Sequence, residues 1–178
     1  NVYFDKYSAW RNDAFEALET QYRFRRDSIL ISLDIKSYFY SVSFSFGELK
    51  QYFDDHEMLK DIKNLTNILE RIFIKYFEVI TPYRKDIGWM KKNHYPLPIG
   101  LFSSMVLGNV YLKEFDRNFL KMPGIIHYGR YVDDMLLVVD RTVKNDETAS
   151  DILDDVFVDT GILEKEGASF LFNGYNGL

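Results

Sequence analysis

Two long stretches of the chain carry hydrophobic residues every three or four positions, which is the period of an amphipathic helix. The first lies within residues 8–25, and the second runs from Ile62 to Ile80 and ends before Pro82. The second stripe comprises Ile62, Leu65, Leu69, Ile72, Phe73, Tyr76 and Ile80. Both stretches are therefore predicted to be helices, and the second is expected to pack its stripe against the core.

Between them the period changes to two. In "SILISLDI", residues 28–35, Ile31, Leu33 and Ile35 fall on one face and Asp34 falls on the other. This alternation predicts a strand that carries an acid on its non-core face.

Further signals complete an alternating pattern of helices and strands. "SFGE", residues 45–48, is a capping box that predicts the start of a helix. Another helix is expected over about 103–120, where "PG" at 123–124 follows. Next, "IIHYGRYV" and "MLLVV" predict a hairpin with Asp133 and Asp134 at its turn. The pattern favours one α/β domain.

Composition narrows the function classes. The chain has 178 residues, no cysteine and a net charge of −5, which excludes disulfides, thiolate zinc sites and binding of nucleic acid over the whole surface. A basic loop at residues 83–98 could still form a local contact. No apolar run is long enough for a membrane span, so a soluble protein is expected. The first residue is Asn1 rather than Met, which suggests a piece of a longer chain.

Adjacent carboxylates carry the candidate chemistry. Asp133 and Asp134 alone are also compatible with an ordinary turn, because Asp bonds its own backbone there. If the strand of Asp34 neighbours the hairpin, however, three carboxylates converge. Oxygen ligands of this kind suit Mg²⁺, and two such ions can support phosphoryl transfer.

Three segments, in order, resemble the palm of reverse transcriptases: "LDIKSYF" at 33–39, "LPIGLFSSMVLGNVYL" at 97–112 and "YVDD" at 131–134. The resemblance covers roughly residues 28 to 140. It implies an α/β (α+β) palm with an antiparallel sheet, helices packed on one face and part of the fingers. Residues 1–178 would form this unit, and a thumb is not recognisable.

The resemblance also implies roles for individual residues. Asp34, Asp133 and Asp134 match the catalytic acids that bind two Mg²⁺ ions, for which Mn²⁺ is a substitute, and the carbonyl of Ile35 matches a backbone metal ligand. Phe39 matches the aromatic residue that lies under the sugar and excludes a 2′-hydroxyl.

Pro98 and Gly100 match the family's nucleotide-binding loop. Many members carry Gln between them, where this chain has Ile99, so a side-chain amide contact is missing. Lys165 is a candidate for assisting the pyrophosphate. The arginines at positions 23, 25 and 26 either face the substrate or form a solvated helix end.

Within the family, the motifs look most like prokaryotic abortive-infection and defence-associated enzymes, with retron and group II intron enzymes as near alternatives. This resemblance implies a cytoplasmic enzyme whose activity is RNA-directed DNA synthesis from dNTPs on an RNA template, with a DNA or protein primer, in antiviral defence. Two alternatives stay open: an RNA-directed RNA polymerase, and a non-catalytic palm-like scaffold that binds nucleic acid. Val132 and Phe39 argue against the first alternative, and three intact acids argue against the second.

Overall fold

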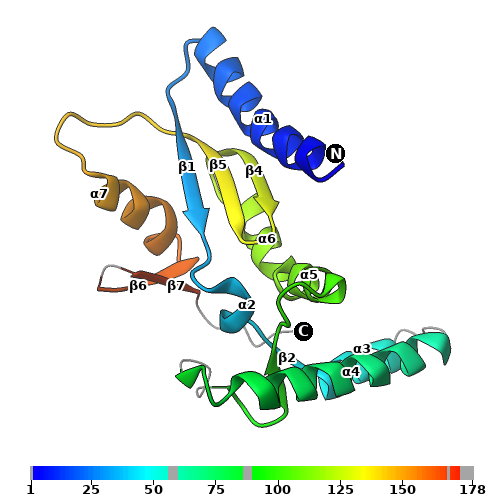
Figure 1. Ribbon diagram of the computed structural model, residues 1–178. Helices are drawn as coiled ribbons and strands as arrows, with labels where there is room; N and C mark the ends of the chain where they lie inside the picture. The colour runs from blue at the N-terminus through cyan, green and yellow to red at the C-terminus, as the bar shows by residue number, and fades with distance from the viewer. Residues whose placement is uncertain (1, 56–59, 86–89, 168, 173–178) are drawn as a thin grey trace. The chain divides into compact units, whose positions relative to one another are not determined.

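The computed structural model describes residues 2–55, 60–85, 90–167 and 169–172. These residues form two compact units, one of residues 2–35 and 113–172 and the other of residues 36–112. Each unit contains helices and antiparallel strands, which confirms the mixed α/β class (Figure 1). Among the helices described, none has the length and apolar character needed to cross a membrane.

The first unit is built on a three-stranded antiparallel sheet with the strand order β1-β5-β4. Its elements are α1 (Val2–Arg23), β1 (Ser28–Asp34), α6 (Lys113–Leu120), β4 (Ile125–Tyr131), β5 (Asp134–Asp140), α7 (Ala149–Leu153), the π-helix η2 (Asp154–Val158), β6 (Leu163–Glu166) and β7 (Ser169–Phe172). The predicted strand of Asp34 and the predicted hairpin are both confirmed, and they neighbour each other. The first helix begins and ends earlier than the predicted 8–25, and the pair β6–β7 was not predicted.

Helices lie against both faces of this sheet, so the expectation of helices on one face is wrong. On one face, the ring of Tyr131 packs against Trp10 of α1, with centroids 6.0 Å apart. On the other face, Tyr128 packs against Phe119 of α6, with centroids 5.2 Å apart. The physical reason lies in the central strand, where residues 135–139 are apolar and buried, so both faces must be covered.

The second unit combines helices with a short two-stranded sheet. Its elements are α2 (Tyr38–Ser41), β2 (Ser43–Ser45), α3 (Phe46–Asp55), α4 (Lys60–Ile80), β3 (His94–Pro96) and α5 (Phe102–Tyr111). The capping prediction for α3 is confirmed, since Ser45 Oγ accepts a hydrogen bond from the Glu48 N–H at 3.4 Å. The predicted basic loop is wrong in part, because β3 lies inside it and pairs with β2.

The helix predicted over about 103–120 is two helices rather than one. The chain leaves the helical region at Leu112, whose φ and ψ are −87° and 3°, and α6 begins at the next residue. Leu112 is buried. A hydrophobic residue at the break does not interrupt the periodic pattern, so periodicity alone does not reveal the break.

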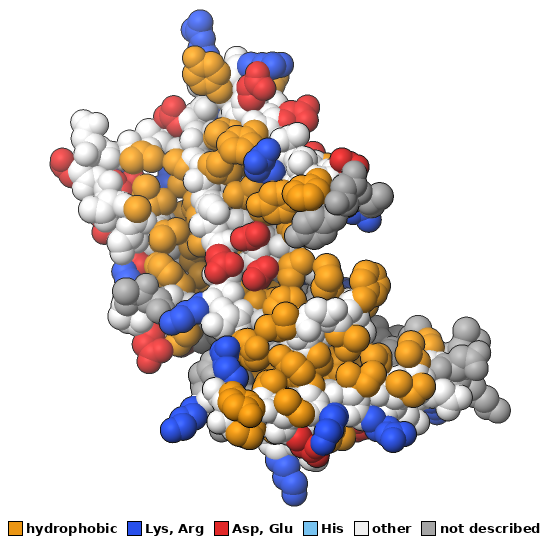
Figure 2. Space-filling view, in the orientation of Figure 1, with side chains coloured by type: hydrophobic (Ala, Val, Ile, Leu, Met, Phe, Trp, Pro, Cys, Tyr) orange, Lys and Arg blue, Asp and Glu red, His pale blue; other side chains and the backbone are white. Residues whose placement is uncertain are grey.

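The predicted helix of residues 62–80 is confirmed as α4, but its packing face differs from the prediction. Phe73 is fully buried and contacts Phe46 edge to face, with centroids 5.0 Å apart. Leu65 and Ile72, however, are 54% and 41% exposed. Hydrophobic side chains accordingly cover much of the visible surface of this helix (Figure 2).

Candidate functional site

Three acids lie together where β1 ends and β5 begins. The antiparallel register places Asp34 directly opposite Asp134, and residues opposite each other project to the same face of a sheet. Asp133 is the second residue of the two-residue turn between β4 and β5, and Asp134 is the first residue of β5. We term Asp34, Asp133 and Asp134 the strand-end acids. Figure 2 shows acidic side chains gathered on the surface near the end of β1.

Burial and like charge both oppose the ionisation of Asp134. Partial burial, followed by the negative charges of Asp133 and Asp34, raises the pKa of Asp134 above its ordinary value. Within the described ranges, none of the strand-end acids forms an ion pair or a side-chain hydrogen bond. Negative charge is therefore concentrated at this sheet end without a compensating side-chain cation.

Backbone hydrogen bonds fix the turn that carries Asp133. The N–H of Ile35 donates to the Asp133 carbonyl at 3.3 Å, so the end of β1 is tied to the turn. Val132 has a φ of 61°, which is strained for a β-branched residue. Its carbonyl accepts a hydrogen bond from Arg130 Nη1 at 2.7 Å. The turn is thus held in an unfavourable backbone conformation by specific contacts.

Arg130 was not singled out from the sequence, although it immediately precedes "YVDD". Its guanidinium is held by both carboxylate oxygens of Asp116 in α6, and Asp116 also accepts from the Tyr128 hydroxyl. Burial and the hydrogen bond to Asp116 raise the pKa of Tyr128. Asp116 lies 14 positions before Arg130, and no local pattern in the sequence signals that pairing.

Of the residues predicted to bind the nucleotide, Ile35 belongs to the first unit, and Phe39, Pro98 and Gly100 belong to the second. Phe39 lies in α2, and its carbonyl accepts a hydrogen bond from the Leu97 N–H at 3.0 Å. This bond brings Phe39 beside the loop of Pro98, which is buried. Gly100 has a φ of +83°, and a Cβ added there would meet nothing within 4 Å. The loop therefore needs glycine for its backbone conformation and has open space at that position.

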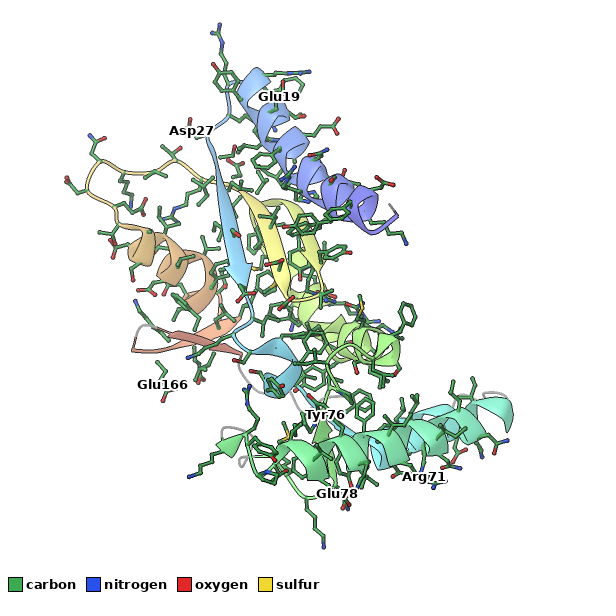
Figure 3. The ribbon with its side chains drawn as sticks, viewed as in Figure 1. Glu19, Asp27, Arg71, Tyr76, Glu78 and Glu166 are labelled. Atoms are coloured by element: carbon green, nitrogen blue, oxygen red, sulfur yellow. The ribbon has the colours of Figure 1, made fainter. Side chains whose placement is uncertain are left out.

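Tyr76 of α4 and Tyr40 of α2 form a pair beside this loop. The hydroxyl of Tyr76 donates to the Tyr40 hydroxyl at 3.4 Å, and the backbone of Ile99 also bonds Tyr76. Burial, followed by the bond to Tyr40, raises the pKa of Tyr76 to about 12. Tyr76 projects from one side of α4, while Arg71 and Glu78 project from the other (Figure 3). The Ile99 position, where a side-chain amide is missing, is thus anchored through its backbone.

The remaining candidates are engaged elsewhere. Lys165 forms an ion pair with Asp154 and donates to Ser150 Oγ at 3.0 Å. Arg23 pairs with Glu19 at 2.6 Å on the exposed end of α1, as a solvated helix end would. Across the described residues, no group of three or more His, Cys, Asp or Glu side chains is arranged to hold a metal ion as it stands.

Comparisons of the chain with protein-family models, with curated proteins and with solved structures found no match. Function must therefore be inferred from the residues themselves.

Proposed function

We propose that this chain is the palm, with part of the fingers, of a reverse transcriptase that adds deoxynucleotides to a primer 3′-hydroxyl or a protein hydroxyl. The observation that carries the proposal is the direct opposition of Asp34 and Asp134, with Asp133 in the adjoining turn. The order of the three motifs along the chain supports the same assignment. Its RNA template and its role in antiviral defence are parts of this proposal.

Stability alone gives no reason for this arrangement. Like charges directly opposite each other in a sheet destabilise the pairing, and clustered carboxylates favour folding only when they are compensated. A protein that kept this sheet as a scaffold would gain by replacing one acid with a neutral residue. The strand-end acids are better explained by a positively charged partner that binds during function.

The donor set fits magnesium. Carboxylate and carbonyl oxygens are the ligands that Mg²⁺ prefers, and Mn²⁺ accepts the same ligands. The residues that would hold two such ions are the strand-end acids and the carbonyl of Ile35. Asp34 is exposed, so rotation about its χ1 can redirect its carboxylate toward a shared ion. When bound, Mg²⁺ would supply positive charge for the attacking and leaving oxygens.

In the proposed reaction a hydroxyl oxygen gives up its proton to water and forms a bond to the α-phosphorus of a dNTP. The bond between the α-phosphorus and the bridging oxygen breaks, and pyrophosphate leaves. In this proposal the ring of Phe39 packs against C2′ of the sugar, where an added hydroxyl would collide with it. The backbone near Gly100 contacts the nucleotide, since a residue without Cβ lets a ligand approach closely.

The first test removes one negative charge while keeping side-chain shape. In the full-length protein, Asp34→Asn or Asp133→Asn should lower the rate of primer extension in Mg²⁺ by at least about 10²-fold, the scale of one lost preorganised charge interaction. Asp140→Asn is the matched control, because Asp140 is an exposed acid at the opposite end of β5. Its rate should stay within about twofold of wild type. Unchanged synthesis by both test variants would exclude the assigned roles.

The second test separates DNA synthesis from RNA synthesis. Phe39→Val should raise the kcat/KM ratio for a ribonucleotide over the matched deoxynucleotide by about 10-fold or more, because a steric clash is removed. Single-nucleotide additions on the full-length protein measure this ratio. A wild type that prefers ribonucleotides would identify an RNA polymerase instead. Nucleic-acid binding without any nucleotide addition would identify a scaffold.

A further inference from the structure

The hairpin turn is fixed at both peptide groups that flank Asp133. The preceding peptide is held through the Val132 carbonyl, which accepts from Arg130 Nη1 at 2.7 Å. The following peptide is held through the Asp133 carbonyl, which accepts from the Ile35 N–H at 3.3 Å. With both peptide planes fixed, the Cα of Asp133 has little freedom, and the direction of its Cα–Cβ bond is set.

Only one of these two hydrogen bonds, the one from Arg130, involves a side chain. The Arg130 side chain is 7% exposed, and its position is fixed by Asp116, whose Oδ1 and Oδ2 accept from Nε and Nη2 at 2.8 and 2.7 Å. A planar guanidinium can make this two-pronged contact and still present Nη1 to a third acceptor. An ammonium group at the end of a lysine cannot reproduce that geometry.

The backbone conformation of this turn is unfavourable for the residue that occupies it. Val132 has a φ of 61°, in the left-handed region that β-branched residues rarely adopt, whereas glycine adopts it readily. Strained residues of this kind persist only where surrounding contacts over-determine them. The contact of Arg130 with the Val132 carbonyl is such a contact, and it acts on the peptide that leads directly into Asp133.

We propose that Arg130, anchored by Asp116, is a positioning residue that holds the Val132–Asp133 turn in its left-handed form and so aims the Asp133 carboxylate for metal binding. The metal-binding role of Asp133 rests on the proposed function. Arg130 itself contacts neither metal nor nucleotide in this scheme. Its effect passes through the backbone. In other proteins, residues that hydrogen-bond to metal ligands likewise set the orientation of those ligands.

The test uses Arg130→Lys in the full-length protein, which keeps the positive charge but loses the three-way contact. Mn²⁺ affinity, measured without nucleotide from the electron paramagnetic resonance signal of free Mn²⁺, should fall by about 10-fold. The kcat for nucleotide addition should fall by about 10-fold or more, while the KM for dNTP stays within about twofold. Asp116→Asn should act in the same direction and serves if Arg130→Lys does not fold.

Rescue by glycine distinguishes positioning from general stabilisation. If Arg130 acts by holding Val132 at positive φ, then adding Val132→Gly to Arg130→Lys should raise Mn²⁺ affinity at least about threefold above that of Arg130→Lys alone. The reason is that glycine adopts positive φ without a stabilising contact. The matched control Arg117→Lys changes another arginine, one that pairs with Glu114 on the exposed side of α6, and should leave Mn²⁺ affinity unchanged.

Two results would overturn the proposal: Mn²⁺ affinity within twofold of wild type in both Arg130→Lys and Asp116→Asn, or no recovery on adding Val132→Gly. The Mn²⁺ measurement does not depend on polymerase activity. A wild type that binds Mn²⁺ in an Arg130-dependent manner but adds no nucleotide would therefore contradict the proposed function and still support the positioning role.

Discussion

Two groups of acids in the first unit have opposite surroundings. The strand-end acids have no cationic side chain as a partner among the residues described. A second group, which we term the paired acids, comprises Glu147, Asp154 and Asp155. Arg141 pairs with Glu147 and, at 2.6 Å, with Asp155, while Lys165 pairs with Asp154.

The difference between the groups separates structural from functional charge. The paired acids are neutralised by side chains of the same unit, so folding alone accounts for them. Burial, followed by the negative charges of Asp133 and Asp34, raises the pKa of Asp134, so the charges of the strand-end acids oppose its ionisation in the folded chain. Charge that the fold leaves uncompensated is available to a cation from solution, and this contrast can be tested directly.

The largest expected effect is the response of thermal stability to Mg²⁺. At a concentration ten times its Kd, a bound ion would stabilise the native full-length protein by about 1.4 kcal/mol. In a domain of this size that free energy raises the Tm by about 3–5 °C. Asp155→Asn should keep this rise, whereas Asp133→Asn should lose most of it. Differential scanning fluorimetry with and without Mg²⁺ measures both.

The matched substitutions make this comparison stringent, since each replaces one Asp by Asn in the same unit. An equal rise in Tm for both variants would mean that Mg²⁺ binds elsewhere or without specificity. A rise lost only in Asp155→Asn would place the cation site at the paired acids, and the contrast drawn above would be wrong.

Without metal, a smaller rise in Tm is expected when one of the strand-end acids is neutralised. The pKa of Asp134 is raised in the folded chain, so the folded state holds its proton to a higher pH than the unfolded state does. Ionised Asp134 therefore destabilises the fold at pH 7, and this cost disappears as the pH falls below the ordinary carboxyl value of 3.8. Asp134→Asn should raise the Tm at pH 7 by about 1–2 °C.

Asp155→Asn should instead lower the Tm at pH 7 by about 1–3 °C, because it removes one partner of a partly exposed ion pair. Melting curves in EDTA between pH 3.5 and pH 7 give both values. If Asp134→Asn lowers the Tm at pH 7, or if its effect grows as the pH falls, then Asp134 is stabilised by its surroundings and the repulsion inferred here is absent.

Local periodicity predicted the elements that carry the acids. The strand of Asp34, the hairpin and the helix of residues 62–80 were all identified from positions of hydrophobic residues a few places apart. The adjacency of β1 and β5 was assumed rather than predicted, since strand order depends on contacts between residues about 100 positions apart. In the structure the two strands are adjacent, and Asp34 is paired with Asp134.

Features that depend on distant partners were missed. The pairing of β2 with β3 joins Phe44 to Tyr95, far apart in the sequence and each on a strand too short for a clear period-two signal. The contact between Arg130 and Asp116 links a strand to a helix, and charged residues of both signs are common along this chain. The exposure of Leu65 likewise depends on which side of α4 meets α3, which periodicity alone does not determine.

The two-residue turn between Tyr131 and Asp134 has a consequence at the level of the gene. A one-codon insertion or deletion at this turn that shifts the register of β5 by one residue would rotate the side chains of β5 to the opposite face of the sheet. Asp134 would then no longer share a face with Asp34, and Met135 would exchange its present contacts for those of the opposite face. The stretch from Arg141 to Glu147, which lies outside the strands, imposes no such register. Over evolutionary time, changes in chain length should therefore accumulate in that stretch and be removed by selection at the turn.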